Sequence, residues 1–412
     1  MIPPATPYLA DRPLAGVRVV ECSSFVAGPS GCMTLAMLGA DIVKVDPIEG
    51  PADINRWPVS KRTGRSLFWN SLNRGKRSVT VDLRSPEGRE LVLALATRPG
   101  PDSGVVVDNA VGRPWLTYAE LANRRSDMIQ VHIQGYNDGR PAVDYTVNPE
   151  IGVPGMTGPV GSADPVNHVV PAWDMLTGMT AVTGLLAALR KRDRTGEGAH
   201  LSIALADVAL SAVASMGWAA EAVEQGDRPR YGNHLYGSFG VDFQTQDHHR
   251  VMVVALTVRQ WRNLVEVTGT GRVFSALEEA AEVDLSLETD RFRMRETIAA
   301  VMRPWFAARS VDEVTRELDD AQVLWSRYRT MSEKVAELLQ DPDRSVVTEF
   351  EQPGIGTMTT ARSPVKLDGE WIDPRPAPTL GQDTDVVLAE LLGLTTAEIG
   401  SLHARGVVAG VA

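Results

Sequence analysis

The sequence predicts an α/β protein with two domains and a parallel main sheet covered by helices. Its 412 residues exceed the size at which one hydrophobic core stops growing, so two domains are expected. Two β-branched runs, at 17–22 and 42–45, flank a glycine-containing turn and an apolar helical stretch at 32–38. This β-α-β unit predicts parallel strand pairing with the helix on one face of the sheet.

The alternation of strands and helices continues to about residue 135. Pro86 begins one helix and Glu87 lies in its first turn, where both residue types are favoured. Ligands of such folds bind at the carboxyl ends of the strands, which places a candidate site at the turn 23–31. That turn lacks both GxGxxG and a Walker lysine, so a dinucleotide or kinase-type site is only weakly supported. Further strands are expected at 79–83, 105–107 and 128–133, and helices at 86–96 and 118–123.

Residues 135–172 break this rhythm, because they are rich in Gly, Pro, Asn and Asp and have no clear period. A long loop inside a compact domain is usually functional or disordered, and its apolar and aromatic residues favour an ordered, functional segment. The second half of the chain predicts a smaller α/β region and then a proline-rich return segment from Pro353 to Pro378. The elements expected there are helices at 177–189, 205–223, 384–392 and 396–403, further helices within 258–340, and strands at 199–203, 241–243 and 251–255.

Composition excludes several classes of function. The net charge of −11 argues against a nucleic acid or an anionic membrane as the main partner. Cys22 and Cys32 are too few for a disulfide framework, so a reducing cytoplasm is expected. We see no signal peptide, and no apolar run approaches the roughly 20 residues of a membrane helix. The histidines and cysteines lack metal-ligand spacing, and there is no GxSxG elbow; the adjacent His248 and His249 are expected at a solvated turn.

Asp174 is a single carboxylate among apolar and small residues, just before a helix whose small residues are spaced for close packing. One reading is an N-cap, because Asp is favoured there. The other is a carboxylate nucleophile, activated by poor solvation near helix N–H groups. A second candidate is the loop 72–78, whose cations Arg74, Lys76 and Arg77 would suit a phosphate-bearing ligand or form a solvated surface. Composition alone leaves these alternatives open.

Several blocks of sequence, in order along nearly the whole chain, resemble the class III CoA-transferase family. The resemblance implies an enzyme that acts on an acyl-CoA thioester of a dicarboxylic acid, with CoA as part of the substrate and no prosthetic group. One departure is that the family's ENFRPG segment reads DNAVGR at 108–113. The blocks are 13–21 (PLAGVRVVE), 25–29 (FVAGP), 38–45 (LGADIVKV), 73–83 (NRGKRSVTVDL), 184–189 (GLLAAL), 194–198 (RTGEG) and 377–385 (APTLGQDTD).

The resemblance also implies roles for individual residues. Asp174 matches the family's catalytic aspartate, which precedes the small-residue helix and the RTGxG turn. The CoA contacts implied by the resemblance are Phe25, Val26, Ala27, Lys76, Asn109 and Arg113. The residues expected around the acyl group are Arg56, Tyr145, Asn167, His168, Gly232 and Asn233.

The family fold implies a Rossmann-like large domain built from both chain ends, 1–224 and 341–412, and a small domain at 225–340. Two such chains are expected to interlock as rings in a homodimer. Blocks such as 166–174 (VNHVVPAWD) are most similar to the branch that moves CoA between the C1 and C4 carboxylates of mesaconate. The alternatives are an intermolecular transferase for another dicarboxylate, a racemase-like enzyme, and a CoA-binding scaffold without turnover. Val143 stands where the racemase branch has a histidine, which counts against racemase chemistry.

Overall fold

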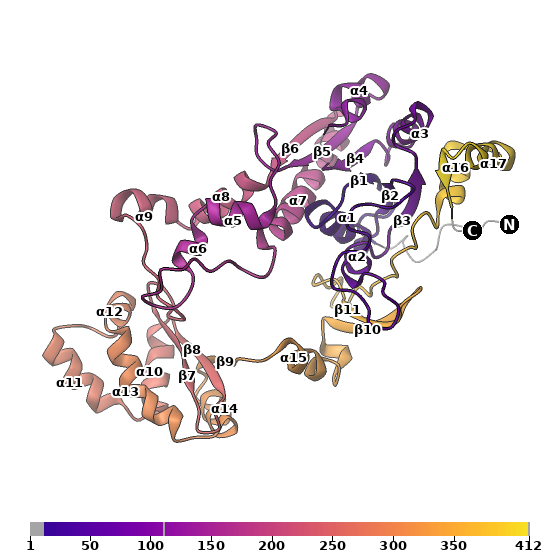
Figure 1. The fold of residues 1–412 in the computed structure, drawn as a ribbon. Helices are drawn as coiled ribbons and strands as arrows, with labels where there is room; N and C mark the ends of the chain where they lie inside the picture. Colours follow the sequence, from indigo (N-terminus) through magenta and orange to yellow (C-terminus); the bar gives the residue numbers. More distant parts are fainter. Residues whose placement is uncertain (1–11, 110–111, 411–412) are drawn as a thin grey trace. The chain divides into compact units, whose positions relative to one another are not determined.

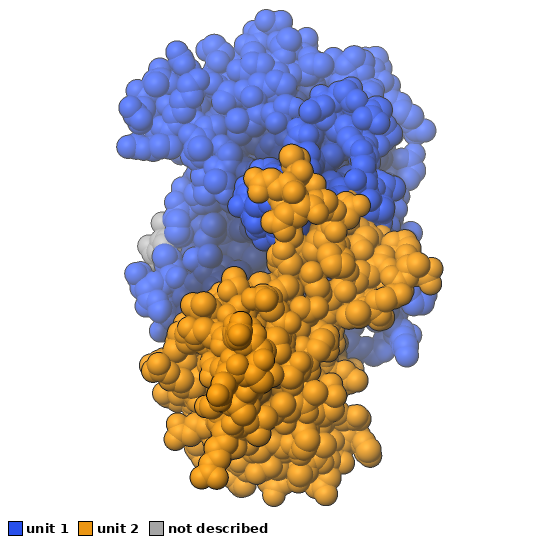
Figure 2. Space-filling view, turned by 90° about the vertical axis from the view of Figure 1, so that its left-hand side faces the viewer, with its two compact units in different colours: residues 1–151, 168–220, 338–412 blue, residues 152–167, 221–337 orange. Residues whose placement is uncertain are grey.

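The computed structural model describes residues 12–109 and 112–410, which divide into two compact units (Figures 1 and 2). Unit 1 comprises residues 1–151, 168–220 and 338–412, and unit 2 comprises 152–167 and 221–337. The segment 152–167 was expected in the large domain but groups with unit 2. Arg230 of unit 2 accounts for this difference, because its guanidinium donates hydrogen bonds to the carbonyl oxygens of Pro154 and Ser162.

Unit 1 is built on a seven-stranded sheet of order β12-β3-β2-β1-β4-β5-β6 (Figure 1). All neighbouring strands pair in parallel except β12, which pairs antiparallel with β3. The predicted α/β architecture with a largely parallel sheet is therefore confirmed. The strands are β1 (Arg18–Cys22), β2 (Asp41–Asp46), β3 (Arg77–Val81), β4 (Val105–Asp108), β5 (Ile129–Gln134), β6 (Ala199–Ala204) and β12 (Val408–Ala409).

Both faces of this sheet are buried under helices, as the near-continuous apolar strands require. Val19, Ile42 and Val107 pack with α1 and α7 on one face, whereas Val20 and Val106 pack with α3, α16 and α17 on the other. The helices are α1 (Ala27–Met37), α7 (Ala172–Thr195), α3 (Pro86–Ala96), α4 (Tyr118–Arg124), α16 (Thr384–Leu392) and α17 (Thr396–Ala404).

Helices α1 and α7 approach each other closely through glycine. A Cβ atom at Gly31 would lie 2.9 Å from the carbonyl oxygen of Gly178, and one at Gly178 would lie 2.7 Å from that of Ala27. The predicted close-packed face of α7 is therefore confirmed. By length and composition alone, α7 is also the one helix in the described part of the chain that could cross a membrane. The buried residues of α7 pack on α1 and the sheet. Helices that pack in a protein core can have the same length and apolar composition as a membrane helix.

Several local predictions were wrong. The segment expected as irregular contains α5 (Asp144–Glu150) and α6 (Val153–Met156). The expected helix 205–223 is two helices, α8 (Leu205–Ser215) and α9 (Trp218–Gln225), because Gly217 adopts a φ of 82° between them. The remaining elements of unit 1 are α2 (Leu67–Leu72), η2 (Pro114–Leu116), η3 (Pro342–Arg344) and a hairpin of β10 (Val347–Gln352) and β11 (Gly356–Ala361).

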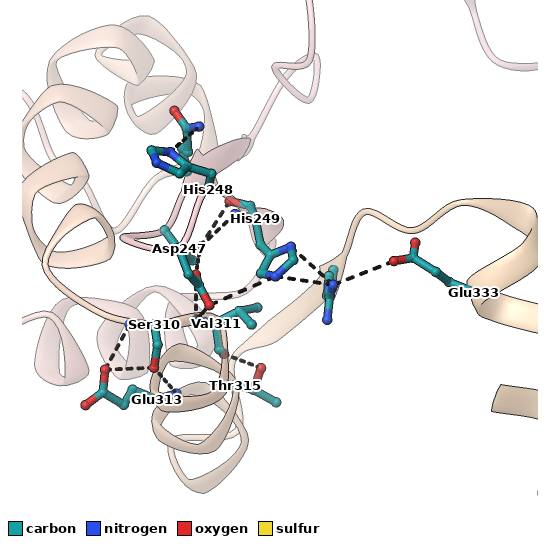
Figure 3. A network of polar contacts seen from close by, with 11 residues as sticks. Asp247, His248, His249, Ser310, Val311, Glu313, Thr315 and Glu333 are labelled. Carbon is teal, nitrogen blue, oxygen red and sulfur yellow. Dashed lines mark hydrogen bonds and ion pairs between the residues drawn. The ribbon is translucent and has the colours of Figure 1, made fainter. Parts of the chain in front are cut away.

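Unit 2 has its own core around a three-stranded antiparallel sheet of β7 (Phe239–Gln244), β8 (Arg250–Ala255) and β9 (Leu324–Arg327). The β7–β8 hairpin ends in the predicted turn, where Asp247 accepts the backbone N–H of Val311 at 3.1 Å (Figure 3). His249 is half-exposed, and its Nδ1 lies 3.1 Å from Nη2 of Arg327, within hydrogen-bond distance. The helices are α10 (Val258–Val267), α11 (Gly271–Ala281), α12 (Glu288–Arg293), α13 (Arg295–Ala307), α14 (Val311–Asp320) and α15 (Met331–Leu338).

Candidate active site

Asp174 lies inside the first turn of α7 and does not cap it. The N-cap position is Pro171, which has no capping side chain. The cap is supplied by Asp144, whose Oδ2 accepts the backbone N–H of Trp173 at 2.7 Å and that of Asp174 at 3.1 Å. The N-cap reading of Asp174 was therefore wrong, and its own carboxylate makes no hydrogen bond with a described residue.

Asp144 is held in place by a second partner. Its carboxylate is 1% exposed, and its Oδ1 lies 2.5 Å from Nε2 of His168. One carboxylate thus receives two backbone N–H groups at a helix N-terminus and an imidazole nitrogen, an arrangement suited to its negative charge. The sequence identified Asp144 only as the neighbour of Val143. Nothing local to it signals that it caps a helix thirty positions later.

The environment of Asp174 favours a basic carboxylate. Partial burial, reinforced by the negative charge of Asp144, raises the pKa of Asp174 to about 7, against a smaller opposing effect of Arg56. A carboxylate that is poorly solvated is more nucleophilic, and a strongly shifted pKa with a specific charged neighbour is typical of functional sites. The arrangement can therefore present a nucleophilic or basic carboxylate at neutral pH.

Aromatic and amide groups frame this pair of acids. The indole Nε1 of Trp173 donates to Oδ1 of Asn148 at 2.9 Å, and the hydroxyl of Tyr145 donates to the carbonyl of Val169 at 3.1 Å. The His168 ring lies between Tyr145 and Trp173, with centroid distances of 6.0 and 5.9 Å. Two predicted acyl-site residues, Tyr145 and His168, are thus brought to the element that carries Asp174.

The turn 23–31 is held in a specific shape. Phe25 adopts a φ of 68°, an uncommon conformation for a non-glycine residue. Its N–H donates to Oδ2 of Asp53 at 3.0 Å. The Asn109 side chain makes two hydrogen bonds with Ser24, the residue before Phe25. Its Oδ1 accepts the Ser24 N–H at 3.2 Å, and its Nδ2 donates to the Ser24 carbonyl oxygen at 2.9 Å. The Phe25 ring is left 41% exposed, while the side chains of Val26 and Ala27 are buried.

Arg56 connects this turn with the acid pair. Its guanidinium lies over the rings of Phe25 and Phe68, 5.6 and 5.4 Å from their centroids. It is exposed, and its charge opposes the rise in the pKa of Asp174. Phe25, Arg56 and Asp174, predicted from separate parts of the chain, therefore belong to one region of unit 1.

Lys76 is buried beneath the turn. Its ammonium group lies 2.7 Å from Oε2 of Glu21, 2.8 Å from Oδ1 of Asn73 and 3.0 Å from the carbonyl of Pro29. These three acceptors match its three N–H donors. The basic loop is thus not a solvated surface, and the geometry favours a supporting position for Lys76. Its predicted contact with CoA stays a prediction.

The remaining predicted residues are Arg113 in unit 1 and three residues of unit 2. Arg113 lines a pocket of about 380 Å³ with Asp108, Gln130 and His132, on the face of the sheet that α4 covers. Ala110 and Val111 of the same loop are outside the described residues. Asn167, Gly232 and Asn233 belong to unit 2, where the Asn233 amide donates to Asp242 at 2.9 Å. Their part in the site stays a prediction. No group of three His, Cys, Asp or Glu side chains suited to a metal ion occurs within 12–109 and 112–410.

Comparison with known proteins gives a consistent result. Residues 14–384 match the profile of CoA-transferase family III. The chain is 49% identical, over 96% of its length and 98% of the relative, to the 2-methylfumaryl-CoA isomerase of Chloroflexus aurantiacus. It is 28% identical to the succinate–glutarate CoA-transferase of Agrobacterium fabrum, with coverages of 92% and 96%. The crystal structure of a CAIB/BAIF family protein from Brucella suis has a TM-score of 0.72 and 27% identity, covering 92% of this chain and 99% of that one.

Proposed function

The chain belongs to CoA-transferase family III, and we propose that it moves CoA between the C1 and C4 carboxylates of one mesaconate. In this reaction 2-methylfumaryl-CoA becomes 3-methylfumaryl-CoA. The observation that carries the proposal is the Asp174 carboxylate, half-buried beside Asp144 with its pKa raised to about 7. The similarity to a relative named for this isomerisation supports the choice of substrate.

The proposed reaction proceeds through covalent intermediates on Asp174. Its carboxylate attacks the thioester carbonyl, the C–S bond breaks, and an aspartyl–acyl anhydride and CoA thiolate form. The thiolate then attacks the aspartyl carbonyl, which gives aspartyl-CoA thioester and the free diacid. The other carboxylate of the retained diacid then attacks this thioester, the C–S bond breaks, and a second aspartyl–acyl anhydride and CoA thiolate form. The thiolate finally attacks the acyl carbonyl of that anhydride, which gives the isomeric acyl-CoA and releases the Asp174 carboxylate. Covalent catalysis of this kind divides one difficult transfer into easier steps.

Negative charge develops on oxygen and sulfur in these steps, and we infer that the N-terminus of α1 stabilises it. Helix α1 begins at Ala27 without a capping side chain, so its first backbone N–H groups are available to an anion. Its first turn contacts Gly178, one turn along α7 from Asp174. We infer that CoA binds along this turn, with Phe25, Val26, Ala27 and Asn109 nearest to it and Lys76 supporting them; Arg113 is the remaining proposed CoA contact.

A transfer within one molecule requires the free carboxylate of the diacid to be held while CoA changes ends. Arg56 is the best candidate for this task, because its exposed guanidinium lies next to Phe25 and acts electrostatically on Asp174. His168 and Tyr145 are the other proposed acyl-group contacts among the residues of unit 1. The roles of Asn167, Gly232 and Asn233 rest on the family resemblance alone.

We also propose that two chains form the interlocked homodimer that the family resemblance implies. Helices α7 and α8, with the residue that follows α8, leave a set of large apolar side chains exposed, and a second chain would cover them. Both cysteines are free and buried, which fits a reducing compartment, and the cytoplasm stays the expected location. The exposed apolar side chains are Met175, Leu176, Met179, Leu210 and Met216.

Intermolecular transfer to another dicarboxylate is the second candidate, supported by the similarity to the succinate–glutarate transferase. Both candidates need Asp174. The test is to incubate the full chain with mesaconyl-C1-CoA, quench it with hydroxylamine and search Asp174 for a hydroxamate by mass spectrometry. A hydroxamate on Asp174, absent from Asp174→Ala, is expected. Turnover by Asp174→Ala, or a hydroxamate on another residue, would overturn the covalent route.

A further inference from the structure

A pocket of about 250 Å³ lies where α1 ends and β3 begins. We propose that it binds a small oxyanion, a phosphate or a carboxylate group, between the guanidinium groups of Arg12, Arg74 and Arg375. The pocket is at the amino ends of the strands. Phe25 and Asn109 follow the carboxyl ends of β1 and β4, so the pocket is at the opposite edge of the sheet from the turn proposed for CoA.

The three guanidinium groups have no carboxylate partner: none of them forms an ion pair with a residue that the structure describes. Arg74 is 4% exposed and donates to the carbonyl oxygens of Ser71 and Ala361, at 2.9 and 2.5 Å. Arg375 donates to the carbonyl oxygen of Gly75 at 2.7 Å. All of these hydrogen-bond partners are neutral, so no carboxylate of the described residues binds these guanidinium groups directly.

Arg74 is buried and Arg375 is partly buried, which makes the missing carboxylate partner significant. Burial lowers the pKa of Arg74 to about 10. It also lowers the pKa of Arg375, with the charge of Asp41 opposing this shift and that of Arg12 adding to it. Buried charges in proteins are normally paired, because an uncompensated charge away from water is costly. An oxyanion would supply the compensating charge, and guanidinium groups bind oxyanions with two parallel hydrogen bonds.

The nearest acids are already engaged elsewhere. Asp373 lines the pocket, but its carboxylate accepts from Arg362 at 2.6 Å. Asp41 accepts from Arg18 at 2.8 Å and from Arg77 at 2.9 Å. The remaining wall includes the apolar residue Met37. A small anion with a short apolar part matches this lining.

The pocket is connected to the element that carries the turn. The Arg74 guanidinium lies 3.3 Å from the Met33 sulfur on α1, and the preceding residue, Asn73, holds the Lys76 ammonium. An anion bound to Arg74 would therefore stabilise the packing of α1. A ligand that binds only the folded chain stabilises it by RT ln(1 + L/Kd), where L is the free ligand concentration, so the melting temperature rises with the logarithm of L above Kd.

The experiment is thermal unfolding of the full chain, titrated separately with inorganic phosphate and with citrate at an ionic strength held constant with NaCl. With at least one anion, the melting temperature is expected to rise with the logarithm of the anion concentration above Kd. The apparent Kd should weaken by about tenfold or more in Arg12→Gln and in Arg375→Gln, since each variant removes one charge-assisted contact. Arg344→Gln, at a side chain that is 90% exposed, is the matched control and should bind like the parent.

The anion that acts at lower concentration identifies the group that the pocket prefers. No rise beyond that in NaCl, with either anion, would overturn the proposal. An equal rise in the parent and in both variants would also overturn it, because the anion would then bind elsewhere. If Arg375→Gln does not fold, Arg12→Gln decides, because the Arg12 side chain makes no hydrogen bond to the described residues. None of these results depends on the proposed CoA transfer.

Discussion

Asp144 accepts the backbone N–H of Asp174 at 3.1 Å, so one acid caps the helix that carries the other. The same carboxylate satisfies a helix N-terminus and places a negative charge beside the proposed nucleophile. Together with burial, that charge raises the pKa of Asp174 to about 7. The relationship makes the reactivity of Asp174 dependent on a residue that never touches the substrate in the proposed mechanism.

The first prediction concerns the pH dependence of this pair. The attacking form of Asp174 is the ionised carboxylate, so kcat/KM should fall as the pH falls through about 7. Asp144→Asn keeps an acceptor for the helix N–H groups but removes the charge. The pKa of Asp174 should then decrease, and the midpoint of the pH profile should move to lower pH. Asp385→Asn is the matched control, because Asp385 also pairs with a histidine, His403, at 2.7 Å. An unmoved midpoint in Asp144→Asn would contradict the coupling.

The second prediction is that Asp174 destabilises the fold at neutral pH. A carboxyl whose folded pKa is about 7 stays protonated in the native state between pH 4 and 7, while the unfolded chain ionises. Stability is therefore lost as the pH rises through this window. At pH 8, Asp174→Asn should raise the free energy of unfolding by about 1–3 kcal/mol after allowance for partial exposure, as measured by denaturant titration. At pH 5 the increase should be smaller. Asp193→Asn, an exposed position on the same helix, should change neither value. A gain that does not depend on pH would rule out ionisation of Asp174 as its cause.

The third prediction addresses the buried ion pair below the turn. Lys76→Met removes the ammonium that lies 2.7 Å from the fully buried Glu21 carboxylate. The loss should be about 3 kcal/mol of unfolding free energy, because a buried charge is left with less compensation. The double variant Glu21→Gln with Lys76→Met should recover part of the lost unfolding free energy. Denaturant titration measures the unfolding free energies of the single and double variants. A small loss of stability with a large rise in KM for the acyl-CoA would instead identify Lys76 as a direct CoA contact.

The fourth prediction tests the contact between α1 and α7. A methyl group at Gly178 would meet the Ala27 carbonyl oxygen at 2.7 Å, so Gly178→Ala should destabilise unit 1 by about 1–3 kcal/mol. Gly184→Ala is the matched control on the same helix, because its methyl group would lie 3.4 Å from Leu201. That variant should be neutral or more stable by about 0.5–1 kcal/mol, since alanine favours helix. Equal effects of the two variants on the melting temperature would contradict the proposed close approach.

Local signals explain which parts of the structure were predictable. The helix 86–96 was predicted to the residue because Pro86 begins it and Glu87 lies in its first turn; the structure adds Ser85 as its cap. Helix α16 was equally well predicted, and Gly393 ends it in a left-handed conformation. Helix α5 was missed because it is short, has Val143 at its N-cap position and contains Pro149. Nothing in its own sequence distinguishes it from an irregular loop.

The errors in the site come from partners that are distant in sequence. The N-cap reading of Asp174 used only its neighbours, whereas the cap comes from thirty positions upstream. The loop with Lys76 was read as a ligand contact or a solvated surface, because its counterion Glu21 lies on another strand. The family resemblance predicts the role of Asp174, and the structure adds burial and the charge of Asp144 as the causes that raise its pKa.

The most direct measurement is to incubate the purified chain with unlabelled mesaconyl-C1-CoA in the presence of isotope-labelled free mesaconate. Mass spectrometry of the products separates the possible routes. The proposed intramolecular transfer predicts that mesaconyl-C4-CoA accumulates without label, and that Asp174→Ala forms none of it. Labelled mesaconyl-CoA would contradict the intramolecular route, and the absence of any C4 isomer would contradict the proposed isomerisation.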